Sequence, residues 1–81
     1  MYTPKQIKNL FDYDEVDPYF FRGFIRVKKG SQWFHVDFNG KPAYNLKFDH
    51  ISPFDEKGMA RARKDRDWFF IRLKGALLEV D

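Results

Sequence analysis

Two stretches of the chain alternate between apolar and polar residues, and each leads into a second apolar stretch. From Phe24 to Lys28, Ile25 and Val27 alternate with basic residues, which is the period-two pattern of a half-buried strand, and Met59 to Arg63 repeats it. After a short polar turn, the next stretch has apolar residues at every second position: Phe34, Val36 and Phe38, and again Phe69, Ile71 and Leu73. The pattern predicts two antiparallel β-hairpins.

A third strand is predicted after each hairpin. Asn39-Gly40 and Lys74-Gly75 are turn sequences, and apolar residues follow both. We therefore expect a strand from about Ala43 towards Phe48 and its counterpart from Ala76 to Val80. The segment between the units, Asp49 to Gly58, contains proline and glycine and is predicted to be a loop.

The first ten residues follow a helical pattern instead. A capping box with proline at the first helical position is formed by Thr3, Pro4 and Gln6. Apolar residues then fall at helical spacing, at Ile7, Leu10 and Phe11. A short N-terminal helix is predicted, although residues 9–16 also align with residues 44–51, so the region from Leu10 onward is alternatively extended.

The strand pattern occurs twice because residues 13–40 align without a gap with residues 48–75. Eight aligned pairs are identical, where ordinary residue frequencies give roughly two: Asp14/Asp49, Pro18/Pro53, Gly23/Gly58, Arg26/Arg61, Lys29/Lys64, Trp33/Trp68, Phe34/Phe69 and Gly40/Gly75. We infer one domain over residues 1–81, with repeat one at about 9–43 and repeat two at about 44–81. The predicted fold class is mainly β, with two tandem antiparallel β-meander or hairpin repeats and a short N-terminal helix.

The residues that the two units share resemble the WG repeat family. Its unit carries an aspartate-containing segment, a Pro-Phe with a following Gly, a basic strand, a Trp-led strand and an Xaa-Gly turn. In repeat one the matching pieces are Tyr13-Asp14, Pro18-Tyr19, Gly23 to Val27, Trp33 to Asp37 and Asn39-Gly40. In repeat two they are Phe48-Asp49, Pro53-Phe54, Gly58 to Ala62, Trp68 to Ile71 and Gly75.

Two departures from the family pattern stand out. The glycine that follows tryptophan in the family is Phe34 in repeat one and Phe69 in repeat two, and this chain has two units where longer arrays are usual. The resemblance implies a β-rich binding module of a family that occurs mainly in bacterial proteins and generally has no known ligand. It therefore indicates the fold more strongly than a function.

The composition predicts a core rich in aromatic residues and excludes several classes of function. Aromatic residues make up 20% of the 81 residues, and each ring can bury about 150–250 Å². The absence of cysteine excludes disulfides and Cys-based zinc sites. No apolar run has the length of a signal peptide or a membrane span, so we expect a soluble, cytoplasmic protein with no membrane contact.

No constellation of residues predicts catalysis, a metal or a cofactor. His35 and His50 have aspartates nearby in sequence, but neither histidine recurs in the other unit, so ordinary surface or hydrogen-bonded histidines are favoured over metal ligands. The acidic run from Asp12 to Asp17 is typical of a solvated segment. We therefore expect no enzyme, no metal site and no cofactor.

The most informative chemistry is a basic and aromatic face predicted in both units. If Ile25 and Val27 point inward, the residues between them point outward, together with alternate residues of the neighbouring strand. The candidate binding residues are Arg26, Lys28, Trp33 and His35 in repeat one, and Arg61, Arg63 and Trp68 in repeat two. Alternatively, the arginine of each unit stacks on that unit's tryptophan as an internal cation–π pair.

An apolar pair without a counterpart, Phe20 and Phe21, is a second candidate. It stands where repeat two has Asp55-Glu56, and an exposed apolar patch commonly marks an interface. Two repeats leave their end faces open, so either the N-terminal helix covers one end or two chains join. We expect a monomer or a weak homodimer.

Together these observations favour binding over catalysis. We expect a non-catalytic protein-interaction module, an adaptor or a small inhibitor, whose partner is another protein. The alternative is a nucleic-acid-binding domain that uses the basic, aromatic face. Its affinity would fall steeply with salt, because phosphate contacts release counterions.

Overall fold

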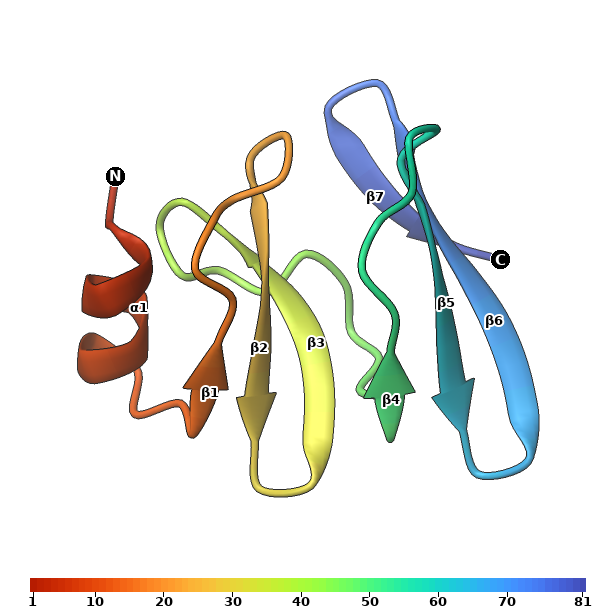
Figure 1. Cartoon of the computed structure of the whole chain (residues 1–81), viewed down its shortest axis with the longest axis horizontal. Coiled ribbons are helices and arrows are strands. Elements are labelled where there is room, and N and C mark those ends of the chain that lie inside the picture. Colours follow the sequence, from red (N-terminus) through yellow and green to blue (C-terminus); the bar gives the residue numbers. More distant parts are fainter.

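Figure 1 shows a helix followed by two small antiparallel sheets, arranged in a row that follows the order of the chain. The computed structural model describes all residues, 1–81. Repeat one forms a sheet of order β1-β2-β3, and repeat two a sheet of order β4-β5-β6-β7. The elements are α1 (Pro4–Leu10), β1 (Glu15–Val16), β2 (Phe24–Lys29), β3 (Gln32–Asp37), β4 (His50–Ile51), β5 (Met59–Lys64), β6 (Asp67–Lys74) and β7 (Leu77–Val80).

The two predicted hairpins and their repetition are confirmed. Strands β2 and β3 pair in the same register as β5 and β6, at the offset of the sequence repeat. The turns of the two hairpins are also stabilised by equivalent hydrogen bonds. The carboxylate of Asp14 accepts a hydrogen bond from the Gly30 N–H at 2.6 Å, and that of Asp49 accepts one from the Asp65 N–H at 2.8 Å.

The predicted helix is confirmed, together with its capping box. The Thr3 hydroxyl accepts a hydrogen bond from the Gln6 N–H, and the Gln6 side chain accepts one from the Thr3 N–H. Ile7 is fully buried in the cluster formed with the first sheet, whereas Leu10 is exposed. The helix therefore covers one face of repeat one, which is the first of the two ways the sequence offered for covering an open end of the repeats.

The helix ends at Leu10, and aromatic packing fixes the chain beyond it. The Phe11 ring contacts the rings of Tyr2 and Tyr13. It also lies so close to Gly40 that a Cβ there would be 2.2 Å from the ring. Because Gly40 has a φ of +79°, glycine meets both the conformational and the steric demand of this position.

The third-strand prediction is confirmed in repeat two, where β7 pairs with β6, but it is wrong in repeat one. There the segment from Ala43 to Phe48 forms no strand, and its pairing with β3 is limited to isolated bridges at Pro42, just before it, and at Phe48. Proline has no N–H for a ladder, and the segment crosses from one sheet to the other while packing the partly buried Tyr44 and Leu46 against the core. The predicted loop after it contains the two-residue strand β4, which pairs with β5.

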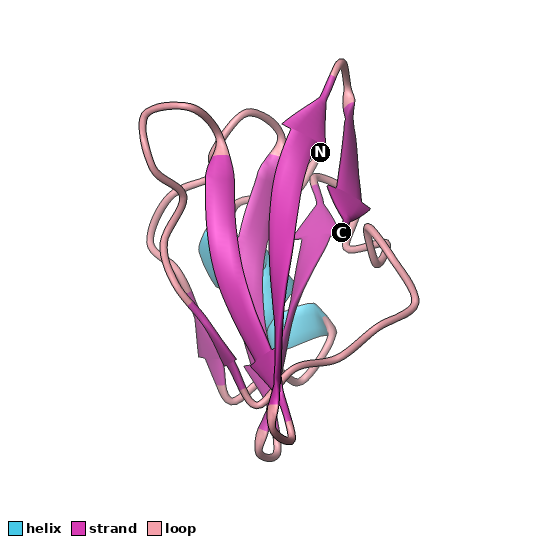
Figure 2. Ribbon diagram, turned by 90° about the vertical axis from the view of Figure 1, so that its right-hand side faces the viewer, coloured by secondary structure: helices cyan, strands magenta, loops and turns pink.

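Two hydrophobic clusters hold the row together. The first lies between α1 and one face of the first sheet and comprises Ile7, Ile25, Val27, Phe34 and Val36. The second joins the other face of that sheet to repeat two and comprises Phe24, Phe48, Ile51, Ala60, Ala62, Ile71 and Leu78. Figure 2, which looks at the repeat-two end, shows the helix on the far side of the strands. The order is thus helix, first sheet, second sheet, and one face of the second sheet has nothing packed on it.

Candidate functional site

Corresponding faces of the two sheets have different surroundings. In the first sheet, the face turned away from α1 carries Phe24, Arg26, Lys28, Trp33 and His35, and is called the covered face here. In the second sheet, its counterpart carries Met59, Arg61, Arg63, Trp68 and Phe70, and is called the open face. The predicted grouping of these residues on one face is confirmed by the strand register. The prediction that this face is outward in both units is wrong for repeat one, because repeat two packs on it.

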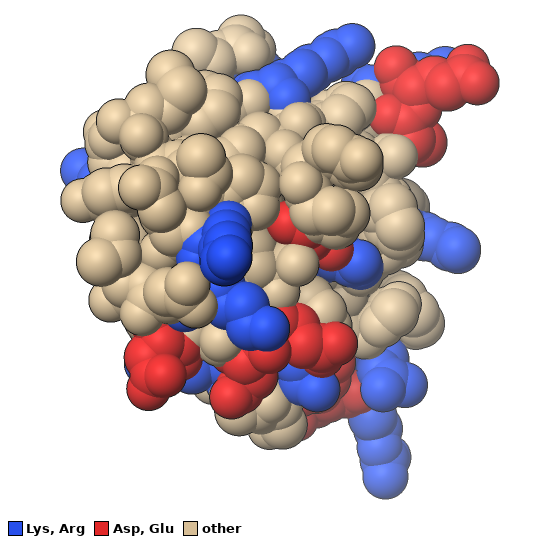
Figure 3. Space-filling view, turned by 60° about the vertical axis from the view of Figure 1, so that its left-hand side comes forward, with Lys and Arg blue, Asp and Glu red and all other residues tan.

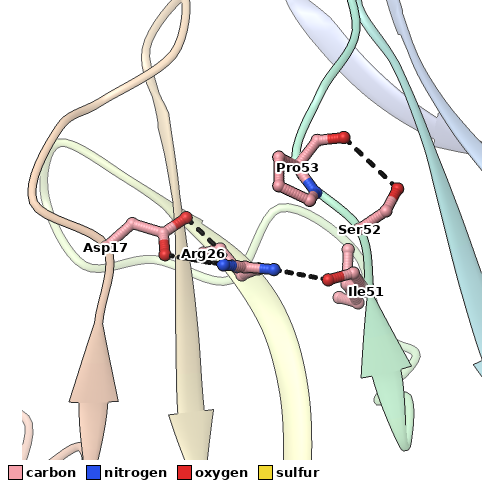
Figure 4. Close-up of polar contacts among 5 residues, drawn as sticks. All are labelled: Asp17, Arg26, Ile51, Ser52 and Pro53. Atoms are coloured by element: carbon pink, nitrogen blue, oxygen red, sulfur yellow. Dashed lines mark hydrogen bonds and ion pairs between the residues drawn. The ribbon is translucent and has the colours of Figure 1, made fainter.

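Arg26 lies at the junction of the two repeats (Figure 4). Its guanidinium forms an ion pair with the Asp17 carboxylate at 3.0 Å and donates a hydrogen bond to the main-chain carbonyl of Ile51 in β4. It also lies 4.8 Å from the centroid of the Trp33 ring, which confirms the internal cation–π interpretation for repeat one. The sequence-predicted site residues Arg26 and Trp33 therefore contact the neighbouring repeat.

The segment that covers this face is held by its backbone and by one ring. The Trp33 N–H donates to the Phe48 carbonyl at 2.7 Å, and the Phe48 N–H donates to the Trp33 carbonyl at 2.9 Å. Six residues further along, the Phe54 ring stacks on Phe21 at 4.8 Å and lies 4.9 Å from the His35 ring. Repeat one thus binds an extended segment by one backbone bridge, the hydrogen bond from Arg26 to the Ile51 carbonyl and the aromatic contacts of Phe54.

His35 is buried at the centre of the covered face, with only 2% of its surface exposed. Its Nδ1 lies 2.8 Å from the Tyr44 hydroxyl, so the two polar groups satisfy each other. Burial, and to a lesser extent the nearby Arg26 charge, lowers the pKa of His35 to about 3. Burial likewise raises the pKa of Tyr44 above its ordinary value. His35 is therefore neutral at physiological pH and part of the structural core.

The open face of repeat two exposes the same positions. Trp68 is 60% exposed and Phe70 46% exposed, against 2% for His35, the counterpart of Phe70. The backbone edge beside them is open as well. On the edge of β6 that pairs with β7, the pairing ends at Phe70, which exchanges two hydrogen bonds with Asp81. The N–H and C=O of Trp68 lie on the same edge and have no partner. Their counterparts at Trp33 are those that bind Phe48.

Two arginines of the open face lack the carboxylates that neutralise their counterparts in repeat one. On the covered face, Arg26 pairs with Asp17, and Lys28 pairs with Glu15 at 3.3 Å. The residues that stand 35 positions after these two acids are Ser52 and His50.

Arg61 and Arg63, the counterparts of those two basic residues, form no ion pair and no cation–π contact. The Asp55 carboxylate near them is bound by the N–H groups of Lys57 and Met59.

A hollow on the open face repeats a hollow of the covered face. Between the repeats, a space of about 170 Å³ is lined by residues that include Asp17, Phe24, Arg26 and His35, and Ser52 to Phe54 closes it. On repeat two, a hollow of about 360 Å³ is lined by Ser52, Pro53, Asp55, Met59, Arg61 and Phe70. Ser52, Met59, Arg61 and Phe70 are the counterparts of Asp17, Phe24, Arg26 and His35. No chain segment closes this second hollow.

Phe20 and Phe21 do not form a free apolar patch. The Phe20 ring packs against Phe38 at 4.5 Å, and the Phe21 ring packs between Arg22 and Phe54, so both phenylalanines are only partly exposed. Both rings keep part of their surface exposed, and their role in an interface stays a prediction. The nearby Tyr19 is the exposed ring of this segment, at 81%.

The remaining polar residues do not come together in a common site. No group of three His, Cys, Asp or Glu side chains is placed to hold a metal ion. The acidic run predicted to be solvated is largely engaged, because three of its four carboxylates bind Arg26, Lys28 or the Gly30 N–H. Towards the α1 end, Figure 3 shows acidic and basic side chains side by side on the lower part of the surface.

The sequence-based prediction omitted Phe70, although the repeat pointed to it. Phe70 stands at the offset position of His35, and its exposure follows from the lack of a cover on repeat two. The hydroxyl of Tyr44 as the partner of His35 could not be found in this way, because the segment that carries it has no regular structure.

Comparison with known proteins gives one match. The family model of the WG containing repeat matches residues 11–33 and 36–68, and the two matches end at Trp33 and Trp68. No curated protein and no solved structure matches the chain significantly. Among the described elements, no helix has the length and apolar composition needed to cross a bilayer.

Proposed function

Because the chain belongs to the WG containing repeat family, we propose that it is a non-catalytic module that binds another protein through the open face of repeat two. The observation that carries this proposal is the exposure of Trp68 and Phe70 at positions whose counterparts in repeat one are covered by a neighbouring repeat. Large exposed aromatic residues beside arginines are typical of interface centres. In the cell such a module would act as an adaptor or a small inhibitor.

The alternative of nucleic-acid binding receives less support. Two of the basic residues on which it depended, Arg26 and Lys28, are neutralised by ion pairs within repeat one. Arg61 and Arg63 remain as unpaired charges on the open face, too few for the steep salt dependence of a phosphate-binding surface. Protein binding is therefore the proposal that the geometry supports best.

The proposal is tested by affinity purification from the native host with three baits. These are the wild type, Trp68→Ser combined with Phe70→Ser, and Lys5→Gln combined with Lys8→Gln on the surface of α1. We expect the wild type and the α1 variant to recover the same protein, and the open-face variant to lose at least about nine-tenths of it, since central aromatic residues carry most interface energy. Equal recovery by all three baits would rule out the open face as the binding surface.

A further inference from the structure

We infer that the open face binds an acidic, extended segment of another protein chain, which adds to the edge of β6 at Trp68 as Phe48 adds to β3 at Trp33. This inference rests on the proposed function and specifies its partner. The interface between the two repeats serves as the template, because it shows how one face of this fold is covered by the segment from Phe48 to Phe54.

The first element of the template is the backbone bridge. On β3, the N–H and C=O of Trp33 both bond to Phe48. On β6, the N–H and C=O of Trp68 lie on the same edge and are free, while the next pair along that edge, Phe70 with Asp81, is closed. An unpaired edge of this kind accepts an added strand, with main-chain hydrogen bonds supplying part of the affinity. The partner segment is therefore extended where it meets Trp68.

The second element is charge. In repeat one, two basic side chains are neutralised within the same repeat by Asp17 and Glu15. In repeat two the corresponding acids are absent, and Arg61 and Arg63 project from the open face without a carboxylate. A partner that supplies two carboxylates would restore the pairing of repeat one, and arginine favours carboxylates through its planar donor groups.

The third element is the hollow beside Phe70. In the template, the Phe54 ring lies on His35, six residues after the bridging Phe48. The counterpart hollow on repeat two is larger, about 360 Å³, and its wall includes the exposed Phe70. An aromatic side chain at the same spacing in the partner would fill it, since aromatic pairs prefer offset or edge contacts at these distances.

A second copy of the chain does not fit this surface. Stacking of copies end to end would require the other end of the row, which α1 already covers through Ile7. Face-to-face pairing of two open faces would bring Arg61 and Arg63 of each copy together, and opposed like charges disfavour association. The acids of this face are already engaged, Asp55 by the N–H groups of Lys57 and Met59 and Asp81 by Arg72. An acidic strand from a different chain meets neither obstacle.

The test uses three synthetic peptides with one common fluorescent label, all derived from residues 46–55 of this chain. The acidic peptide is Leu-Glu-Phe-Asp-Glu-Ile-Asp-Pro-Phe-Asp. The neutral peptide replaces each Glu by Gln and each Asp by Asn, and the third peptide keeps the acids but replaces both Phe by Ser. Binding to the full chain is measured by fluorescence anisotropy, against wild type, Arg61→Gln with Arg63→Gln, and the matched charge control Lys5→Gln with Lys8→Gln.

We expect the acidic peptide to bind at least about tenfold more tightly than the neutral and the Phe-free peptides, as two new charge pairs and one ring contact would allow. The Arg61 and Arg63 variant should lose about tenfold in affinity, and the α1 control should bind like wild type. Equal affinity for the three peptides, or no binding of any, would overturn the inference.

Two further outcomes would also overturn it. One is tighter, Arg61-dependent binding of a single-stranded twelve-residue DNA probe, which would identify a nucleic-acid site. The other is a dimer in light scattering that Trp68→Ser abolishes, which would identify a second copy as the occupant. If the affinity purification with Trp68→Ser and Phe70→Ser loses its protein while the peptides do not discriminate, the open face binds proteins but not acidic strands.

Discussion

At the scale of single residues, the same side chain has a different role in each repeat. Arg26 and Arg61 are identical in sequence and in strand position, yet the first binds Asp17 and the Ile51 carbonyl while the second has no ionic partner. Trp33 is half-buried under repeat two, whereas Trp68 is 60% exposed. Whether one of these residues serves structure or recognition is thus decided by whether another segment covers it.

The buried His35 predicts a pH dependence of stability. Its pKa is lowered to about 3 by burial, whereas in the unfolded chain it takes its ordinary value of 6.5. Between these two pH values His35 is protonated in the unfolded chain but neutral in the folded one. The folded state is therefore most stable above pH 6.5 and loses stability as the pH falls towards 3. We expect the free energy of unfolding to be about 2 kcal/mol lower at pH 5 than at pH 7, measured by urea denaturation.

Variants separate this histidine from the exposed one. His35→Phe combined with Tyr44→Phe removes both members of the buried pair, with Phe70 as the precedent for phenylalanine at this position, and should flatten the profile between pH 5 and 7. His50→Gln should retain the slope, because His50 is exposed. A slope that survives the double variant would assign the effect to other groups.

At the scale of elements, α1 is the cover of the first sheet. Its seven residues are too few to form a stable helix alone, so tertiary packing must supply most of its stability. That packing is concentrated in Ile7, which is fully buried, while Leu10 points away and is 62% exposed. The helix does for repeat one what a further repeat would do in a longer array.

Ile7→Ala should therefore cost about 2–4 kcal/mol of unfolding free energy, because it removes a buried side chain from the cluster between α1 and the first sheet. Leu10→Ala, in the same helix and with a similar loss of volume, should change it by less than about 0.5 kcal/mol. Chemical denaturation of both variants at one pH gives the comparison. If both variants lost a similar amount of unfolding free energy, Ile7 would not be the residue that anchors α1 to the first sheet.

At the scale of the whole molecule, the two repeats share one core and should unfold together. Phe24 of repeat one lies in the same buried cluster as Ile51, Ala60 and Ile71 of repeat two, and Arg26 bridges the two sheets. Neighbouring repeats that bury a common interface are energetically coupled. A chain of this size is then expected to show a single cooperative transition.

The two tryptophans allow this to be measured from each repeat separately. Trp68→Phe leaves Trp33 as the only fluorophore of its kind, and Trp33→Phe leaves Trp68. Within each variant, the fluorescence and circular dichroism transitions in urea should have the same midpoint, and the native emission of Trp68 should lie at the longer wavelength because it is 60% exposed. A Trp68 transition that precedes the circular dichroism transition would show independent repeats.

The sequence by itself determined the repeating unit. Period-two alternation, turn residues and the offset of the repeat are local properties, and they predicted both hairpins, the capped helix, β7 and the family. The same local rules failed between Ala43 and Phe48, where the chain forms no strand but crosses between the sheets and packs Tyr44 and Leu46 against the core. Tertiary packing overrides strand propensity there.

Only the tertiary structure decided which of two equivalent faces is free. Alternation separates the two faces of a strand, but it contains no information about what lies against each of them. The chain stacks its repeats in a row, so Arg26, Trp33 and His35 became an interface within the molecule, while Arg61, Arg63 and Trp68 stayed at its surface. Burial is a property of neighbours distant in sequence, and for this reason it could not be inferred from either repeat alone.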